Sequence, residues 1–112
     1  MTVFARILKG EIPSTPVYED DLVYAFDDIS PVAPVHVLVI PRQEVVNLNH
    51  VDTSHEAMLG RLLLAARKVA EAKGVANTGY RCVINKGSDA CQSVFHLHLH
   101  VIAGRSMSWP PG

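Results

Sequence analysis

The chain has 112 residues, of which 48% are hydrophobic and 19% are charged, and its formal net charge is -1. This composition indicates a globular protein, and the length predicts a single domain over residues 1–112. The mixed charges form no basic stripe, which excludes a general nucleic-acid-binding surface. No apolar segment has the form of a signal peptide or reaches the ~20 residues of a membrane span. We therefore expect a cytoplasmic protein with no membrane partner, whose two cysteines are reduced thiols.

The first part of the chain is expected to form a short helix and three strands. Phe4, Ile7 and Leu8 share one helical face, and Gly10 suits the end of that helix. Runs of β-branched and aromatic residues bounded by turn residues predict the strands. The expected elements are a helix over 4–9 and strands over 17–19, 22–28 and 35–40, with a loop over 29–34.

The second part is expected to contain one long helix followed by two strands. Thr53 and Glu56 have the spacing of a capping box, and apolar residues then recur at helical intervals as far as Gly74. Cys82 alternates with Tyr80 and Ile84, which predicts that its side chain belongs to the core. Strands on both sides of one long helix predict an α+β fold with a mainly antiparallel sheet. The expected elements are a helix over 53–73 and strands over 80–85 and 94–102.

The candidate chemistry is concentrated in His96, His98 and His100. Successive side chains of a strand point to opposite faces, so these three histidines are expected to share one face while leucines occupy the other. Three adjacent imidazoles cannot all carry charge cheaply, so at least one is expected to stay neutral near pH 7. A neutral imidazole with one nitrogen hydrogen-bonded offers a lone pair on the other. Such a ring can act as a nucleophile or as a metal ligand.

Two other interpretations of the three histidines remain open at this point. The histidines can be ordinary polar residues of a solvent-facing strand, although strict alternation argues against this. They can also form a zinc site together with a distant histidine such as His36. The lack of a carboxylate on that strand and of a Cys-x-x-Cys pair weighs against zinc. The polar turn over residues 87–93, which leads directly to the histidines, favours covalent catalysis on a phosphate bound by that turn.

At these residues the sequence resembles the histidine triad family, and in particular its branch of nucleotide-binding proteins. The specific motif is His-φ-His-φ-His-φ-φ, where φ is an apolar residue, and it is present as residues 96–102. The resemblance extends from about Phe4 to Gly112. The other matching segments are residues 4–7, 25–31, 33–36, 39–41, 87–89, 92–94 and 109–112.

The resemblance implies a homodimer with a continuous sheet, purine nucleotide binding (AMP or GMP) and hydrolysis of phosphorus–nitrogen bonds in purine nucleoside phosphoramidates. It implies no cofactor and no metal. His98 would be the nucleophile, and Asp28 would bind the ribose. His36 and His96 would be supporting histidines, with Asn85, Gln92, Ser93 and His100 at the phosphate. The apolar base pocket would consist of Val3, Phe4, Ile7, Phe26 and Ile29, and Trp109 would approach the active site of the partner subunit.

Several of these residues also have simpler interpretations. Phe4, Ile7 and Phe26 can be plain core residues, and Asp28 can serve a turn. Two positions depart from the family pattern. Cys91 stands where relatives usually have glycine, and Asp27 adds a carboxylate beside the expected ribose site.

Three hypotheses about function follow from the sequence. The first is a nucleoside phosphoramidate hydrolase that forms a nucleotidyl-histidine intermediate on His98. The second is a nucleotide-binding adaptor whose catalysis is incidental. The third is a zinc-binding interaction module. The intact triad with Gln92 and Ser93 favours the hydrolase.

Overall fold

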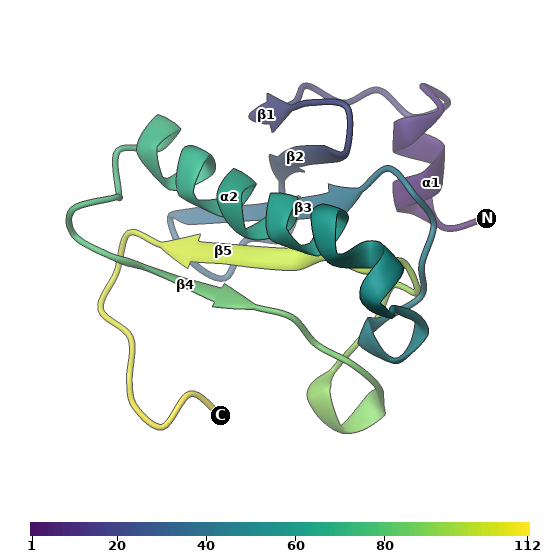
Figure 1. Cartoon of the computed structure of the whole chain (residues 1–112). Helices are drawn as coiled ribbons and strands as arrows, with labels where there is room; N and C mark the ends of the chain where they lie inside the picture. Colours follow the sequence, from purple (N-terminus) through teal and green to yellow (C-terminus); the bar gives the residue numbers. More distant parts are fainter.

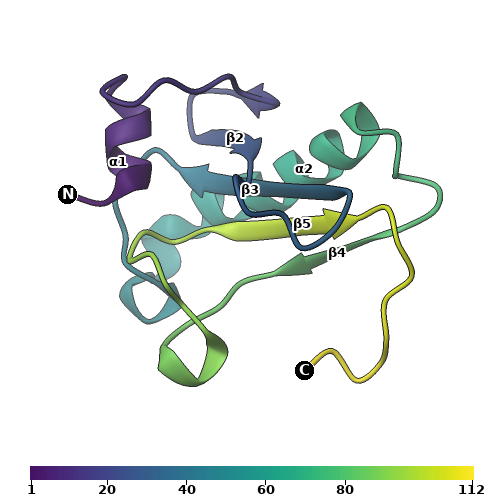
Figure 2. The same ribbon diagram turned by 180° about the vertical axis from the view of Figure 1, so that it is seen from behind.

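The computed structural model describes residues 1–112 and contains a five-stranded antiparallel sheet with the strand order β1-β2-β3-β5-β4. Figure 1 shows the long helix α2 crossing one face of this sheet, with the short helix α1 apart from it at one side of the sheet. Seen from behind in Figure 2, the opposite face of the sheet lies in front of α2. The α+β fold with a mainly antiparallel sheet, one long helix and a short N-terminal helix is confirmed.

The helices and strands have the following bounds. The α-helices are α1 (Val3–Leu8) and α2 (Glu56–Ala72), and three 3₁₀ turns are η1 (Leu48–His50), η2 (Thr53–His55) and η3 (Ser88–Ala90). The strands are β1 (Tyr18–Glu19), β2 (Val23–Asp27), β3 (Val35–Pro41), β4 (Tyr80–Val83) and β5 (Leu99–Ala103).

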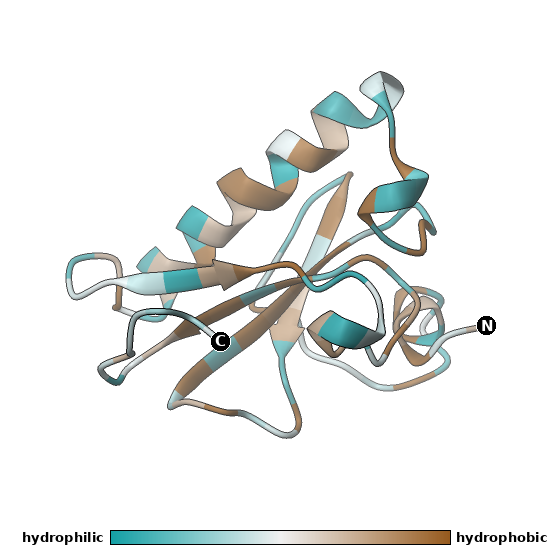
Figure 3. Cartoon of the chain, turned by 90° about the horizontal axis from the view of Figure 1, so that it is seen from below, coloured by the Kyte–Doolittle hydropathy of each residue, from teal (hydrophilic) through white to brown (hydrophobic).

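The two faces of the sheet carry two different apolar clusters. On the α2 face, alternate residues of β2, β3 and β5 pack against Met58, Leu62, Ala65, Ala66 and Val69 of the helix. On the other face, Phe4 of α1 packs with Tyr24, Phe26, Leu38 and Ile40. Figure 3 shows the result, in which hydrophobic residues concentrate on the central strands while polar residues recur along α2. Because successive side chains of a strand point to opposite faces, each central strand contributes to the main core on the α2 face and to the Phe4 cluster on the other face.

The long helix begins later and differently than the sequence predicts. Residues 53–55 form the 3₁₀ turn η2, and α2 starts at Glu56. Asp52, rather than Thr53, is the N-cap of η2, and its side chain and that of His55 form the capping box. Aspartate is as strong an N-cap as threonine, so the cap can move one residue upstream without loss. Neither this helix nor α1 is long and apolar enough to cross a membrane.

The strand predicted over 94–102 is wrong at its start. Sheet pairing begins at Leu99, so His96 and His98 precede β5 and only His100 lies within it. The pairing of β3 with β5 would next need Pro41 opposite Leu97, and proline has no backbone N–H to donate. Leu97 instead donates its N–H to the Val45 carbonyl. The alternation of side chains nevertheless persists, because Leu97 and Leu99 remain in the α2 core.

The prediction that Cys82 belongs to the core is also wrong, since its side chain is exposed. Cys82 pairs with Val101 and so shares the α2 face of the sheet. However, α2 packs on β1, β2, β3 and β5, and β4 lies at the edge beyond them. An edge strand leaves its outer residues uncovered within one chain. Both cysteines are free thiols, as predicted.

Candidate active site

His98 is held with one nitrogen occupied and the other available. Its ring is 7% exposed, and its Nδ1 lies 2.7 Å from the carbonyl oxygen of His96. A carbonyl can only accept, so Nδ1 carries the proton and donates it. In the neutral ring the lone pair is then on Nε2. Phe4 packs edge-on against this ring with a centroid separation of 5.1 Å, which fixes its orientation.

His96 holds in place the carbonyl that accepts the hydrogen bond from His98. Its ring is 1% exposed and its Nε2 donates to the Pro41 carbonyl at 2.9 Å. The same residue supplies the backbone carbonyl that binds His98. His96 therefore anchors the segment that enters β5 and positions His98.

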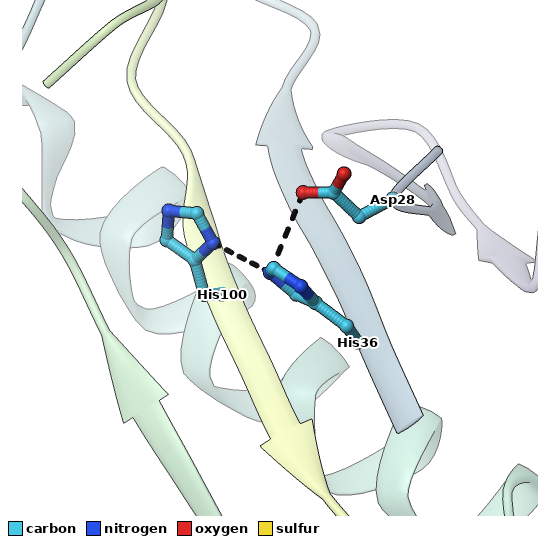
Figure 4. A group of neighbouring side chains, drawn as sticks. All are labelled: Asp28, His36 and His100. Carbon is cyan, nitrogen blue, oxygen red and sulfur yellow. Dashed lines mark hydrogen bonds and ion pairs between the residues drawn. The ribbon is translucent and has the colours of Figure 1, made fainter. Parts of the chain in front are cut away.

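His36, His100 and Asp28 form a second hydrogen-bonded group on the same face (Figure 4). His36 Nδ1 accepts from the Val32 amide at 3.1 Å, which leaves the proton of the neutral ring on Nε2. This Nε2 lies 2.9 Å from His100 Nδ1 and 3.4 Å from Asp28 Oδ2. His100 Nδ1 then accepts, so the neutral His100 ring carries its proton on Nε2. That Nε2 is buried and has no partner within the chain.

The electrostatics of the two pocket histidines favour their neutral forms. Burial lowers the pKa of His98 below its ordinary value of 6.5, although the hydrogen bond to His96 acts in the opposite direction. Burial, together with the nearby rings of His98 and His36, lowers the pKa of His100 to about 4. Near pH 7 the site thus presents a free lone pair on His98 and an unpartnered N–H on His100. These groups suit a nucleophile and a hydrogen-bond donor to an anion.

His98 and His100 open into a pocket of about 580 Å³ on the face of the sheet opposite α2. The pocket extends between α1 and the end of β2 and has both apolar and polar walls. Of the residues predicted for the site, it is lined by Val3, Phe4, Ile7, Phe26, Asp28, Ile29, Ser93, His98 and His100. A pocket lined by both histidine and hydroxyl groups and by apolar and aromatic residues suits a ligand that has an anionic group and a flat aromatic group.

The sequence matches the HIT domain family over residues 9–107. This chain belongs to the HIT family. It is 51% identical to the protein named adenylylsulfatase HINT1 of Arabidopsis thaliana, covering 99% of this chain and 76% of that one. It is also 51% identical to the 14 kDa zinc-binding protein of Brassica juncea, covering 99% of each.

Solved structures of the HIT family show the same fold. A HIT family hydrolase from Legionella pneumophila superposes with a TM-score of 0.96 at 44% identity, covering 100% of both chains. A histidine triad nucleotide-binding protein from Candida albicans superposes with a TM-score of 0.84 at 30% identity, covering 98% of this chain and 83% of that one.

The turn that precedes the triad of this HIT domain is closed by Gln92. The Gln92 side chain accepts from the Gly87 amide at 3.0 Å and donates to the carbonyls of Val46 at 2.9 Å and Val94 at 3.2 Å. Gln92 is thus engaged in closing the turn, whereas Ser93 lines the pocket. Cys91 has φ 64°, in the left-handed region that glycine adopts most easily, which accounts for the glycine usual in the family at this position.

Five predicted site residues lie outside the pocket lining, namely His96 and Gln92, described above, and His36, Asn85 and Trp109. His36 contacts the ring of His100, and Asn85 lies between β4 and η3. Trp109 is 82% exposed on the C-terminal tail, where the Arg81 guanidinium lies 6.0 Å from its ring centre and donates to the Ser108 carbonyl at 3.0 Å. In Figure 2 this tail lies at the opposite end of the molecule from α1.

One wall of the pocket could not be predicted from the sequence. Residues 12–15, between α1 and β1, line it together with Leu38 and Val94. The two prolines around Ser14 and Thr15 indicate an extended segment, but nothing local in the sequence indicates which surface that segment covers. Asp27 also borders the pocket, but it lies opposite Val37 of the α2-face core, and its carboxylate pairs with Lys73 Nζ at 2.8 Å at the end of α2.

Proposed function

We propose that this protein hydrolyses purine nucleoside phosphoramidates through a covalent intermediate on His98. The observation that carries the proposal is the free Nε2 of His98, fixed by the His96 carbonyl and directed to a pocket that has a second histidine donor and an apolar wall. The relative named adenylylsulfatase and the structure named as a nucleotide-binding protein support a nucleotide substrate.

The reaction proceeds in two displacements at the α-phosphorus. His98 Nε2 attacks the phosphorus, the phosphorus–nitrogen bond breaks, and the amine leaves with a proton that it takes from water. Water then attacks the same phosphorus, the bond to His98 Nε2 breaks, and the nucleotide is released while the proton of the attacking water returns to solvent. The His100 Nε2–H is suited to donate to a phosphoryl oxygen as charge develops there. A neutral histidine is already a good nucleophile, so neither step requires a metal.

The nucleotide is expected to lie along the pocket. Its phosphate would be at His98, His100 and Ser93, with Asn85 and Gln92 nearby, and its ribose at Asp28. The purine would lie against Val3, Phe4, Ile7, Phe26 and Ile29. Phe4 and Phe26 already pack edge-on at 5.4 Å, which provides an aromatic wall for a flat base.

A second subunit is part of the proposal. Ile29 is 98% exposed and Trp109 is 82% exposed, so neither is covered within one chain. The edge strand β4 also leaves Tyr80 and Cys82 exposed. A two-fold dimer that pairs this edge would continue the sheet and cover apolar surface. The tail of one subunit would then approach the active site of the other.

The test is the variant His98→Ala. It should fold, bind AMP with an affinity close to that of the wild type, and lose several orders of magnitude in turnover of an adenosine phosphoramidate. Retention of more than about a tenth of the activity, equivalent to a change of only ~1.4 kcal/mol in the barrier, would refute the mechanism.

A zinc-binding module is the second candidate. Asp28, His36 and His100 each offer a ligand atom within 4.8 Å of the others, and Asp28 supplies the carboxylate that the histidine strand itself lacks. A metal would have to replace the hydrogen bond between His36 and His100 and displace its proton. On the hydrolase proposal, protein dialysed against a chelator keeps full activity and added zinc inhibits it. Activity that is lost on dialysis and restored by zinc would favour the metal site.

A further inference from the structure

The end of the pocket away from His98 contains two hydroxyl groups in a mainly apolar wall. Ile7, Ile12 and Phe26 supply apolar surface there, whereas Ser14 and Thr15 supply hydroxyls. The Asp27 side chain is on the α2 face of the sheet, where its carboxylate pairs with Lys73 at the end of α2. The two hydroxyls are therefore the polar side chains that remain free to meet a ligand in this part of the pocket.

Ser14 differs from Thr15 because a buried tyrosine orients it. The Tyr24 hydroxyl donates to Ser14 Oγ at 3.0 Å. The Tyr24 ring is 8% exposed and is held between Phe26, at a centroid separation of 5.9 Å, and the Arg42 guanidinium, which lies 5.8 Å from its centre. Since the Tyr24 proton fills this bond, the hydrogen of the Ser14 hydroxyl remains available to donate to a ligand.

A row of aromatic rings connects Ser14 with the nucleophile. His98 contacts Phe4, with ring centres 5.1 Å apart, and Phe4 contacts Phe26 at 5.4 Å. Phe26 contacts Tyr24, which binds Ser14. Four successive contacts thus separate Ser14 from His98 along one pocket, and the outer edge of a base is expected near Ser14 if the phosphate is at His98.

An apolar wall can cover the faces of a base but cannot satisfy the nitrogen and oxygen atoms on its edge. Ser14 itself is exposed in the free protein, and a base that covers it would leave such an atom without a partner at a cost in free energy, so a matching donor gives selectivity for bases that have an acceptor there. We propose that Ser14 is a specificity-determining residue that donates a hydrogen bond to a ring nitrogen of the bound purine, and that Tyr24 is its positioning residue. The inference rests on the proposed function, because it requires a nucleotide with its phosphate at His98.

The test measures the affinity of the full chain for AMP and for three analogues in which N1, N3 or N7 of the adenine is replaced by CH. Ser14→Ala should bind AMP about five- to tenfold more weakly than the wild type. One of the three analogues should bind wild type and Ser14→Ala equally, because it lacks the acceptor. Ser14→Thr keeps a hydroxyl and should recover most of the affinity. Ser106→Ala, which removes an exposed hydroxyl elsewhere, is the control.

Tyr24→Phe supplies the readout for positioning. It should weaken AMP binding about two- to threefold in the wild-type background and have no further effect in the Ser14→Ala background. Ser14→Ala that binds AMP as tightly as the wild type, or loses the same factor for all three analogues, would overturn the inference and leave the proposed function intact. A wild-type protein that binds no AMP would overturn both.

Discussion

Nε2 of His36 lies 2.9 Å from Nδ1 of His100, although the two residues are 64 positions apart in the chain. The Val32 amide donates to the other nitrogen of His36, so the proton between the two rings belongs to His36. This contact fixes the proton of the neutral His100 on Nε2, toward the pocket. The pairing of β3 with β5 thereby determines which nitrogen of His100 can act on a ligand.

Hydrolytic activity should decline in acid as the pocket histidines are protonated. Burial lowers the pKa of His98 below 6.5, so its lone pair should remain available down to pH values below 6.5. We predict that the pH profile of kcat/KM with a phosphoramidate has an acid limb with an apparent pKa under 6.5. An acid limb centred above pH 6.5 would contradict a lowered pKa of His98.

The same histidines should make the fold less stable in acid. The pKa of His100 is lowered from 6.5 to about 4, so the unfolded chain takes up the proton more readily. Its stabilising contribution is complete above pH 6.5 and is lost as the pH falls toward 4. Across that range the free energy of unfolding of wild type should fall by about 2 kcal/mol more than that of His100→Asn, allowing for solvent screening. Equal slopes for wild type and His100→Asn would refute the assignment.

The Asp28 carboxylate should recognise the ribose. Its Oδ1 accepts from the Ser30 amide at 2.8 Å, and the substitution Asp28→Asn would keep that bond while removing the charge near His36. Asp28→Asn should weaken AMP binding about tenfold, and should weaken binding of a nucleotide without ribose hydroxyls much less. Calorimetric titration of both ligands checks this, with Asp89→Asn in the exposed turn as the control. An equal loss for both ligands would show that Asp28 acts through the fold instead.

Asp20 should stabilise the tight connection between β1 and β2. Burial raises its pKa, but hydrogen bonds from the Tyr18 hydroxyl at 2.7 Å and from the Leu22 and Val23 amides outweigh this and lower it to about 2. The stabilisation is therefore present above pH 3.8 and is lost as the pH falls through 2.

Asp20→Asn should lower the free energy of unfolding at pH 7 by about 2 kcal/mol. Asp21→Asn is a matched control, since this side chain is 81% exposed and contacts Arg61 alone, and its effect should be under ~0.5 kcal/mol. Denaturant unfolding of both variants measures the difference. Equal effects would contradict a specific role for Asp20.

The sequence predicts the elements of this chain well where the pattern is local. The apolar residues of α2 recur at the helical period, and β3 is a run of β-branched residues. The start of β5 could not be predicted, because it depends on Pro41 of another strand. The exposure of Cys82 depends on how far α2 extends over the sheet. The role of residues 12–15 depends on where that segment lies after α1.

In the candidate site, too, local sequence patterns identify the residues, whereas contacts with distant segments determine what each residue can do. Alternation identifies three histidines, but the choice among nucleophile, anchor and donor follows from the carbonyls of His96 and Pro41 and from the ring of His36. None of these partners follows from residue spacing. Gln92 is recognisable from the motif, yet its hydrogen bonds to Gly87 and to the Val46 carbonyl could not be inferred.

The C-terminal tail should select among leaving-group amines. Deleting residues 107–112 removes the exposed Trp109 and the Ser108 carbonyl contact of Arg81, but no residue of the cores. The deletion should change relative kcat/KM values among phosphoramidates with different amines more than it changes the melting temperature. Sedimentation or light scattering should give the mass of a homodimer.

Mixed dimers test whether the tail acts across the two subunits. In a heterodimer of the truncated chain with a His98→Ala chain, the working nucleophile lies opposite an intact tail. Selectivity should then return toward that of the wild type. No recovery would mean that the tail serves its own subunit or has no role.

The central claim is that hydrolysis passes through a nucleotidyl group on His98, and the stereochemical course at phosphorus tests it most directly. A nucleoside thiophosphoramidate of one known configuration is hydrolysed by the wild-type protein in water enriched in heavy oxygen, and the configuration of the nucleoside thiophosphate product is determined. Each in-line displacement inverts the phosphorus, so attack by His98 followed by attack by water predicts overall retention. Overall inversion would mean that water attacks the substrate directly and would contradict the covalent mechanism.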